Sequence, residues 1–154
     1  MSKNSYTRSI TVKNTANAAF MALTKDIAKW WTKPDQPLQT VGDRAKFTFP
    51  PGKSYWTFEA TNLQQDRLVE MRCVDAMHIH EGQPKEIEKE WLGTVVIWKL
   101  SSDGDETTID FEHIGLVPEL NCYGVCEAGW DLFFVASLKE YLNTGVGHPH
   151  SSPA

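Results

Sequence analysis

The chain has 154 residues, of which 41% are hydrophobic and 23% are charged, the balance of an ordinary globular protein. Its 15 basic and 20 acidic residues leave a net charge of −5, which argues against a partner recognised through a nucleic-acid phosphate backbone. This length fits one domain that buries a core without disulfides. We expect a single domain over residues 1–145 and a flexible, polar C-terminal tail over residues 146–154.

The cysteines and the apolar runs indicate the compartment. Cys73, Cys122 and Cys126 form an odd set, which fits a reducing cytoplasm. No apolar run approaches the ~20 residues of a membrane span, and the first residues lack the apolar core of a secretory signal. We therefore expect a cytoplasmic protein that binds neither nucleic acid nor a membrane.

The first half of the chain predicts a strand and then helices. β-branched and aromatic residues predict a strand over residues 5–13. Apolar residues then recur at spacings of three and four over residues 16–30, the pattern of one helix or of two short helices. Pro34 and Pro37 end this helical region.

Alternating apolar and polar residues predict most of the sheet. Five further strands are expected, over residues 44–49, 55–61, 68–74, 91–100 and 107–115. Proline and glycine predict a turn at 50–52, and polar residues predict a hairpin turn at 101–105. Residues 78–90 are polar and are expected to form a loop.

The last element is a long helix. Residues 119–143 contain no proline, Pro118 suits a first helical position, and Gly145 suits the C-cap. Antiparallel strands with helices on one face make an α+β domain, and a long helix on a curved sheet leaves room for a ligand between the two layers.

Several short pieces of the sequence, in their order and spacing, point to a known family. They are residues 20–24, Trp30-Trp31, Gly42, residues 67–69, residues 91–94, Leu100, residues 103–105, Thr108, residues 113–116, Gly129-Trp130, residues 137–139, Tyr141-Leu142 and Thr144-Gly145. Together they resemble the SRPBCC (START-like) superfamily, and within it the group named after the activator of heat-shock protein 90 ATPase. The resemblance implies a helix-grip fold. In this fold a curved antiparallel sheet of six to seven strands wraps around the C-terminal helix, with two short helices after the first strand and a cavity between the layers.

Relatives in this superfamily bind apolar molecules, act as cyclases or assist a chaperone, and a fold by itself does not decide among these functions. Our first expectation is a protein that binds a small hydrophobic or aromatic molecule, with no catalytic residue, no metal and no cofactor. One alternative is a co-chaperone-like or stress-response interaction protein that uses the outer face of the sheet. Another is a cyclase or hydrolase in which His113 acts as acid or base.

The expected cavity walls are aromatic side chains of the strands and the last helix, with one histidine. They are Trp56, Phe58, Trp98, Phe111, His113, Trp130, Phe133, Phe134 and Tyr141. His113 shares the inward face of its strand with Phe111, so it would orient the ligand. The alternative is a core histidine that is hydrogen-bonded to a neighbouring polar group.

Cys122 and Cys126 lie four residues apart and share one helix face. A metal bound there would need further ligands, which His78 and His80 with Glu81 would have to supply. We expect instead that the thiols are buried and inert, and that the histidine pairs at 78 and 80 and at 148 and 150 are solvated.

Two further features concern packing and partners. Gly129 in mid-helix costs about 1 kcal/mol relative to alanine, which favours a close approach of helix and strand, with space for a ligand as the alternative. Both faces of the strand over residues 91–100 are apolar, so a second copy of the chain is a candidate partner. A chaperone is the other candidate protein partner.

Overall fold

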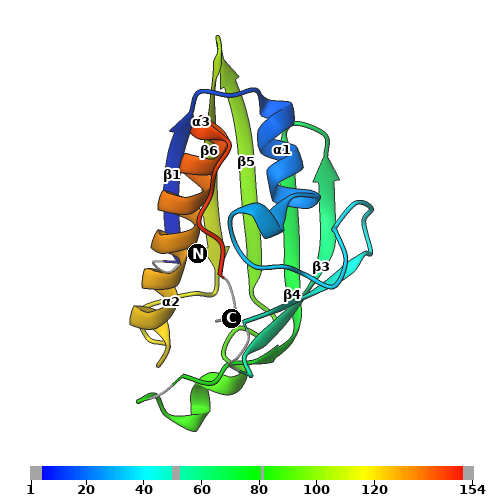
Figure 1. Ribbon diagram of the computed structural model, residues 1–154. Coiled ribbons are helices and arrows are strands. Elements are labelled where there is room, and N and C mark those ends of the chain that lie inside the picture. Colours follow the sequence, from blue (N-terminus) through cyan, green and yellow to red (C-terminus); the bar gives the residue numbers. More distant parts are fainter. Residues whose placement is uncertain (1–4, 50–52, 81, 151–154) are drawn as a thin grey trace.

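The computed structural model describes residues 5–49, 53–80 and 82–150, and shows a curved sheet with helices on one face (Figure 1). The strands are β1 (Tyr6–Val12), β2 (Arg44–Thr48), β3 (Tyr55–Gln64), β4 (Leu68–Met77), β5 (Val95–Asp103) and β6 (Glu106–Ile114). They form one six-stranded antiparallel sheet in the order β1-β6-β5-β4-β3-β2. The α+β helix-grip fold is thereby confirmed. The turn expected at 50–52 and residues 151–154 lie outside the described residues.

The helices divide into short connections and one long element. The short ones are α1 (Ala16–Thr24), η1 (Ile27–Lys29) and η2 (Lys85–Lys89). The first two are the two short helices expected after the first strand, and the Thr15 side chain caps α1 by accepting a hydrogen bond from the backbone N–H of Ala18 at 3.0 Å. In the described ranges, no helix is long and apolar enough to cross a membrane.

The alternation along β5 and β6 separates core from surface. Val96 pairs with His113 and Trp98 with Phe111, and all four side chains are buried against the helices. The residues between them, such as Ile97, point to the outer face of the sheet.

The long C-terminal helix has 22 residues and consists of α2 (Tyr123–Trp130), the π-helical η3 (Asp131–Leu138) and α3 (Lys139–Thr144). It begins at Tyr123 and not at residue 119 as expected. The reason is that residues 118–122 form turns, and the Glu90 carboxylate accepts the backbone N–H groups of Asn121 and Cys122 at the helix entrance. The expected C-cap is confirmed, since Gly145 has a φ of 89° and donates to the Tyr141 carbonyl.

Several strand boundaries differ from expectation. β3 continues to Gln64 and β5 to Asp103, so the hairpin turn expected at 101–105 is confined to Gly104 and Asp105. β4 continues to Met77, and η2 interrupts the expected loop over residues 78–90. The expected strand over 91–100 begins only at Val95, because Trp91 enters a turn in which the Thr94 N–H donates to the Trp91 carbonyl at 2.9 Å. This turn directs the Trp91 ring toward Trp130, with the two rings stacked at 5.9 Å.

Residues 146–150 of the expected tail lie against the domain. The backbone N–H of His148 donates to the Ser137 hydroxyl at 2.8 Å, and that of His150 donates to the Trp31 carbonyl at 2.6 Å. The flexibility of the tail stays a prediction.

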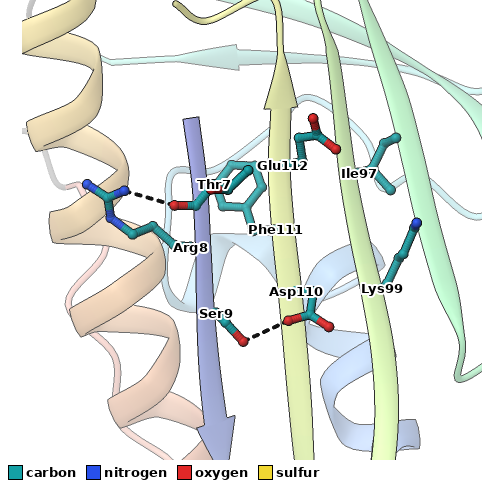
Figure 2. Close-up of a pocket in the computed structure, with 8 residues that line it drawn as sticks. All are labelled: Thr7, Arg8, Ser9, Ile97, Lys99, Asp110, Phe111 and Glu112. Carbon is teal, nitrogen blue, oxygen red and sulfur yellow. Dashed lines mark hydrogen bonds between the residues drawn. The ribbon is translucent and has the colours of Figure 1, made fainter. Parts of the chain in front are cut away.

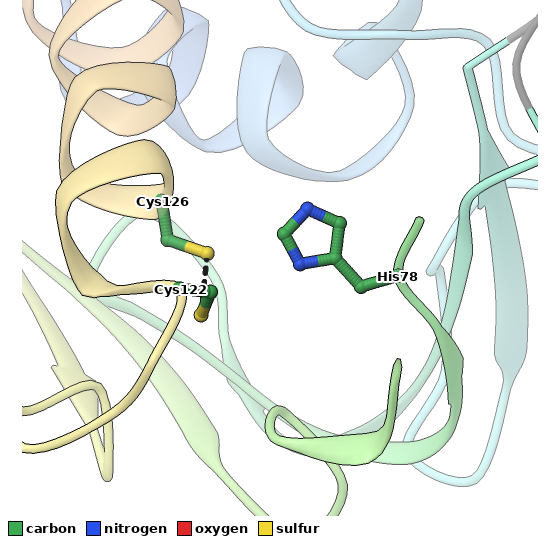
Figure 3. A group of neighbouring side chains, drawn as sticks. All are labelled: His78, Cys122 and Cys126. Carbon is green, nitrogen blue, oxygen red and sulfur yellow. Dashed lines mark hydrogen bonds between the residues drawn. The ribbon is translucent and has the colours of Figure 1, made fainter. Parts of the chain in front are cut away.

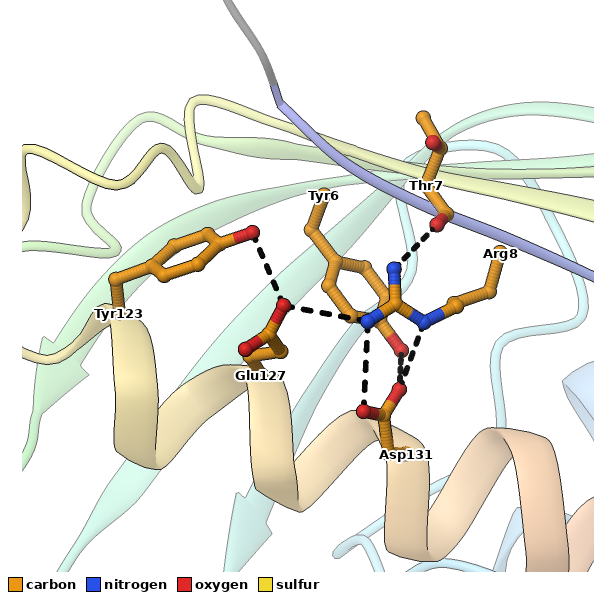
Figure 4. A network of polar contacts seen from close by, with 6 residues as sticks. All are labelled: Tyr6, Thr7, Arg8, Tyr123, Glu127 and Asp131. Atoms are coloured by element: carbon orange, nitrogen blue, oxygen red, sulfur yellow. Dashed lines mark hydrogen bonds and ion pairs between the residues drawn. The ribbon is translucent and has the colours of Figure 1, made fainter.

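A network of polar contacts fixes the long helix to the first strand (Figure 4). The Tyr6 hydroxyl and the Arg8 Nε both donate to the Asp131 carboxylate, at 2.7 and 2.9 Å. Arg8 also donates to Glu127 at 3.2 Å, and its guanidinium lies 4.4 Å from the centre of the Tyr6 ring. Glu127 and Asp131 thus hold one face of the helix against β1, and a neighbouring face turns toward β3 and β4.

Candidate functional site

A cavity of about 380 Å³ lies between the long helix and the end of the sheet where β3 and β4 meet the connecting loops. Six aromatic rings surround it, from Trp31, Phe49, Trp56, Trp91, Trp130 and Phe133. The other lining residues are Ser54, His78, Ile79, His80, Val125, Cys126, Gly129 and His150. No aspartate, glutamate, lysine or arginine occurs among these lining residues.

Two buried polar atoms belong to side chains that line the cavity and lack a partner. The Nε1 of Trp56 and the Nδ1 of His78 have no hydrogen-bond partner among the described residues. Buried polar groups in proteins are nearly always hydrogen-bonded, so two such atoms without a partner at one cavity are unusual. Both atoms are themselves buried, so a bound molecule would pair with them only after a small movement of the two side chains.

Gly129 faces this cavity from α2. A methyl group built on its Cα would meet nothing within 4 Å. The expected close approach of helix and strand is therefore wrong at this position, and the alternative of free space is what the structure shows.

His113 is buried in the core and does not line the cavity. Trp130 Nε1 donates to its Nδ1 at 3.0 Å, and its Nε2 lies 2.8 Å from the Thr94 hydroxyl. Burial lowers the pKa of His113 to about 3, so the ring is neutral near pH 7. This is the hydrogen-bonded core histidine considered as the alternative, with both ring nitrogens already engaged.

The remaining expected wall residues divide between the cavity and the core. Trp56, Trp130 and Phe133 line the cavity. The residues buried in the core between the layers are Phe58, Trp98, Phe111 and Phe134. Tyr141 lies beside a separate hollow near Met21 and Asp26. The reason for the division is that the cavity occupies one end of the sheet, while packed side chains fill the rest of the space between the layers.

Sequence reasoning missed four cavity residues that stand at the ends of elements. Trp31 follows η1, Phe49 follows β2, His78 follows β4, and Trp91 precedes β5. Periodicity assigns faces only within an element, so it leaves Trp31 and His78 unassigned. Phe49 and Trp91 fell inside the expected strands over 44–49 and 91–100 but were not named as cavity walls. The adjacent Trp30-Trp31 pair, used in the sequence analysis only for the family resemblance, is a signal that could have indicated aromatic residues near η1.

His78 is buried, in contrast to the expected solvated side chain, whereas His80 is exposed. The backbone N–H of His78 donates to the Glu88 carbonyl at 3.0 Å, and its ring lies 5.0 Å from the Trp56 ring. These contacts turn the imidazole inward, toward the thiols of Cys122, just before α2, and Cys126, on α2 (Figure 3).

His78, Cys122 and Cys126 form a buried group whose ligand atoms all lie within 4.8 Å of one another. The Cys126 thiol donates to the Cys122 sulfur at 2.8 Å, and Trp91 Nε1 donates to the Cys126 sulfur at 3.2 Å. The hydrogen bond from Cys126 lowers the pKa of Cys122 to about 6, and the same pairing raises the pKa of Cys126. These three side chains are the ones in the described structure that could hold a metal ion together.

A second hollow of about 500 Å³ lies on the outer face of the sheet (Figure 2). Its lining includes the charged side chains of Lys99, Asp110 and Glu112, and Ser9 donates to Asp110 at 2.7 Å. Such a charged surface differs in character from the aromatic cavity, which is the stronger candidate for a small apolar molecule.

Comparison with known proteins rests on structure. No known family description matches the chain, and no curated protein matches it.

The solution structure of the Aha1 dimer from Colwellia psychrerythraea is 25% identical, with a TM-score of 0.71 over 92% of this chain and 97% of that one. DynU16, a protein from the dynemicin biosynthetic locus, is 19% identical with a TM-score of 0.73, and the match covers 98% of this chain but 51% of DynU16. CalU16 from Micromonospora echinospora is 16% identical with a TM-score of 0.56, over 84% of this chain and 70% of that one. Taken with the sheet order and the long C-terminal helix, these likenesses show that the chain has the helix-grip fold of the SRPBCC superfamily, as the sequence resemblance predicts.

Proposed function

We propose that the protein binds a small, uncharged aromatic molecule in the cavity between the long helix and β3 and β4. The observation that carries this proposal is the lining, in which six aromatic rings surround about 380 Å³ and no carboxylate, lysine or arginine is present. That volume falls within the roughly 300–1,000 Å³ typical of small-molecule sites. Burial of apolar surface, at about 25 cal/mol per Å², would supply most of the affinity.

The two unpaired polar atoms add a preference for ligands with a hydroxyl or carbonyl oxygen. The indole N–H of Trp56 is a donor, and His78 Nδ1 is a second polar contact close by. A buried donor without a partner costs about 1–3 kcal/mol, so a ligand oxygen that pairs with Trp56 recovers part of that free energy.

The geometry supports binding more strongly than turnover. His113, the residue that the enzyme alternative requires, has both ring nitrogens engaged by Trp130 and Thr94 and lies outside the cavity lining. A general base must come within hydrogen-bond reach of the proton that it removes. The three buried free thiols are consistent with a reducing compartment, so the cytoplasm remains part of the proposal.

A second copy of the chain is a further proposed partner. Val95, Ile97 and Ile114 place apolar side chains together on the outer face of β5 and β6, and Ile114 is 41% exposed. The similar structure from Colwellia psychrerythraea is described as a dimer. Sedimentation of the wild type and of Ile97→Lys tests this, and a monomer for the wild type at micromolar concentration would count against it. A chaperone partner remains only a prediction from the family resemblance.

Calorimetric titration with 2-naphthol, a flat neutral probe with one hydroxyl, tests the binding proposal. We expect saturable binding with a dissociation constant in the micromolar to millimolar range. This range corresponds to a favourable binding free energy of about 4–8 kcal/mol. Gly129→Leu should weaken binding at least tenfold, because the new side chain occupies the free space beside the helix.

Gly124→Leu is the matched control. Gly124 lies on the same helix, also has open space at its Cα, and does not line the cavity. Equal weakening by the two substitutions, or a wild type without saturable binding, would contradict the proposal.

A further inference from the structure

We propose that His78, Cys122 and Cys126 form a binding site for a zinc ion, with the fourth coordination position open to the aromatic cavity. This site shares His78 with the proposed site for an aromatic molecule, but its test does not depend on that proposal. The argument rests on the geometry of the three side chains, their chemistry and the residues that position them.

The three side chains converge from two parts of the chain. His78 follows β4, while Cys122 and Cys126 stand four residues apart at the start of α2. Their ligand atoms lie within 4.8 Å of one another. Tetrahedral zinc with Zn–S bonds of about 2.3 Å and Zn–N bonds of about 2.0–2.1 Å needs neighbouring ligand atoms roughly 3.5–3.8 Å apart.

The fit requires only small rotations of side chains. The two sulfurs, now 2.8 Å apart, would separate by about 1 Å, and the imidazole would approach them. Figure 3 shows the His78 ring already turned toward both thiols.

The donor set selects the metal. Two thiolates and an imidazole favour zinc over the hard cations Mg²⁺ and Ca²⁺, which prefer oxygen ligands. His78 is 5% exposed, and its Nδ1 has no hydrogen-bond partner in the described part of the chain. A buried imidazole nitrogen without a partner, on a ring next to two thiols, is the observation that separates this group from an ordinary pair of buried cysteines.

A short segment next to the site positions both cysteines. The Glu90 carboxylate accepts the backbone N–H of Cys122 at 3.0 Å, and the Trp91 indole donates to the Cys126 sulfur at 3.2 Å. The contact with Glu90 holds the backbone of Cys122 in place, and the indole N–H of Trp91 would stabilise the negative charge of a Cys126 thiolate. Glu90 and Trp91, which precede β5, therefore hold the two cysteines at the start of α2 in position.

The open position follows from the lining of the cavity. His78 and Cys126 both line the aromatic cavity, so an ion bound to three protein ligands would face it. Zinc sites with three protein ligands take an exogenous molecule as the fourth. The ligand class for that position is a small molecule with an oxygen, nitrogen or sulfur donor.

Cobalt is a spectroscopic probe for this site. The reduced, metal-free protein is titrated with Co²⁺ and then with Zn²⁺. We expect one Co²⁺ per chain, with thiolate-to-metal charge-transfer bands and the visible bands of tetrahedral cobalt, and displacement by one equivalent of Zn²⁺. Cys122→Ser and Cys126→Ser should each remove about half of the charge-transfer absorbance, and Trp91→Phe should weaken zinc binding about tenfold.

Matched controls separate this site from adventitious binding. Cys73→Ser changes a buried cysteine outside the group, and His80→Gln changes a histidine at the same cavity, so both should bind zinc like the wild type. Zinc should also raise the melting temperature of the wild type but not that of His78→Gln, a variant that keeps both cysteines.

Three results would overturn the proposal. They are cobalt spectra without charge-transfer bands, zinc binding that is unchanged by loss of either cysteine, and a Cys122–Cys126 disulfide in protein kept under reducing conditions. The first two mean that the metal binds elsewhere or not at all, and the third means that the pair is a redox pair.

Discussion

The indole N–H of Trp130 donates a hydrogen bond to Nδ1 of His113 across 3.0 Å. Because an indole N–H only donates, this contact places the proton of the neutral imidazole on Nε2, which then donates to the Thr94 hydroxyl at 2.8 Å. The Thr94 hydroxyl in turn donates to the Trp91 carbonyl at 2.6 Å. One chain of hydrogen bonds thus connects the long helix, β6 and the turn that holds Trp91 at the cavity.

The buried imidazole of His113 in this hydrogen-bond network predicts how the stability of the protein depends on pH. Burial lowers the pKa of His113 to about 3 from the ordinary value of about 6.5. Between these values the unfolded chain binds a proton that the folded chain does not, so the free energy of unfolding falls as the pH falls. The contribution of this group is about 1.4 kcal/mol per pH unit, and urea unfolding between pH 7 and pH 4 measures it.

His113→Gln is the control for that measurement. An amide side chain can accept from Trp130 and donate to Thr94, but it does not titrate in this range. The free energy of unfolding of this variant should change less with pH than that of the wild type, by the amount that corresponds to one proton. An unchanged slope would contradict the assignment to His113.

Trp56→Phe tests the unpaired indole N–H at the cavity. Phenylalanine keeps most of the aromatic surface and removes the donor. We expect wild-type protein to bind 2-naphthol more tightly than naphthalene by about 0.5–1.5 kcal/mol, the range of one hydrogen bond. In Trp56→Phe this preference should disappear, as measured by calorimetry with the two probes, and a preference of undiminished size would exclude Trp56 as the donor.

The glycines make opposite predictions for stability. Gly129→Ala should stabilise the protein by about 1 kcal/mol, because the added methyl group enters open space and alanine favours the helix. Gly115→Ala should destabilise it, since φ at this position is 101° and the new Cβ would lie 2.8 Å from the Thr94 Cγ2. Thr94 has little freedom to move away because its hydroxyl is engaged by His113 and Trp91. Thermal unfolding of both variants measures the difference, and a shift in the same direction for both would be inconsistent with this packing.

Asp131 anchors the long helix to β1, so its removal should destabilise the fold. Asp131→Ala leaves the hydroxyl of the buried Tyr6 and one edge of the Arg8 guanidinium without an acceptor. We expect a loss of about 1–3 kcal/mol by chemical unfolding. Asp131→Asn, which keeps one oxygen acceptor, should lose less, and Lys139→Ala at an exposed position of the same helix should change stability by no more than about 0.5 kcal/mol. Equal losses in all three would show that Asp131 has no special role.

Much of the fold follows from local patterns in the sequence. The period-two alternation of β5 and β6 determines which side chains point inward. Gly145 marks the end of the long helix because this C-cap needs a residue in the left-handed backbone conformation, which glycine adopts readily. The start of the same helix was not predictable in this way. It depends on the carboxylate of Glu90, a residue 32 positions before Cys122 in the chain.

The cavity shows where local patterns end. Trp56, Trp130 and Phe133 were expected at the ligand because they face inward on regular elements. Phe111 and His113 face inward by the same rule and yet lie in packed core, since the direction of a side chain does not reveal how far apart the two layers are. His78 depended on a backbone hydrogen bond to Glu88 that no periodicity encodes.

The most direct test of the proposed binding site is the set of six tryptophan indole N–H signals in a ¹⁵N-correlated NMR spectrum during titration with 2-naphthol. If the cavity is the binding site, the indole signals of four tryptophans should shift most, because their rings line it: Trp31, Trp56, Trp91 and Trp130. The signals of Trp30 and Trp98, which are buried away from the cavity, should shift least. Shifts confined to Trp30 and Trp98, or no saturable shift of any indole signal, would contradict the proposal that this cavity binds an aromatic molecule.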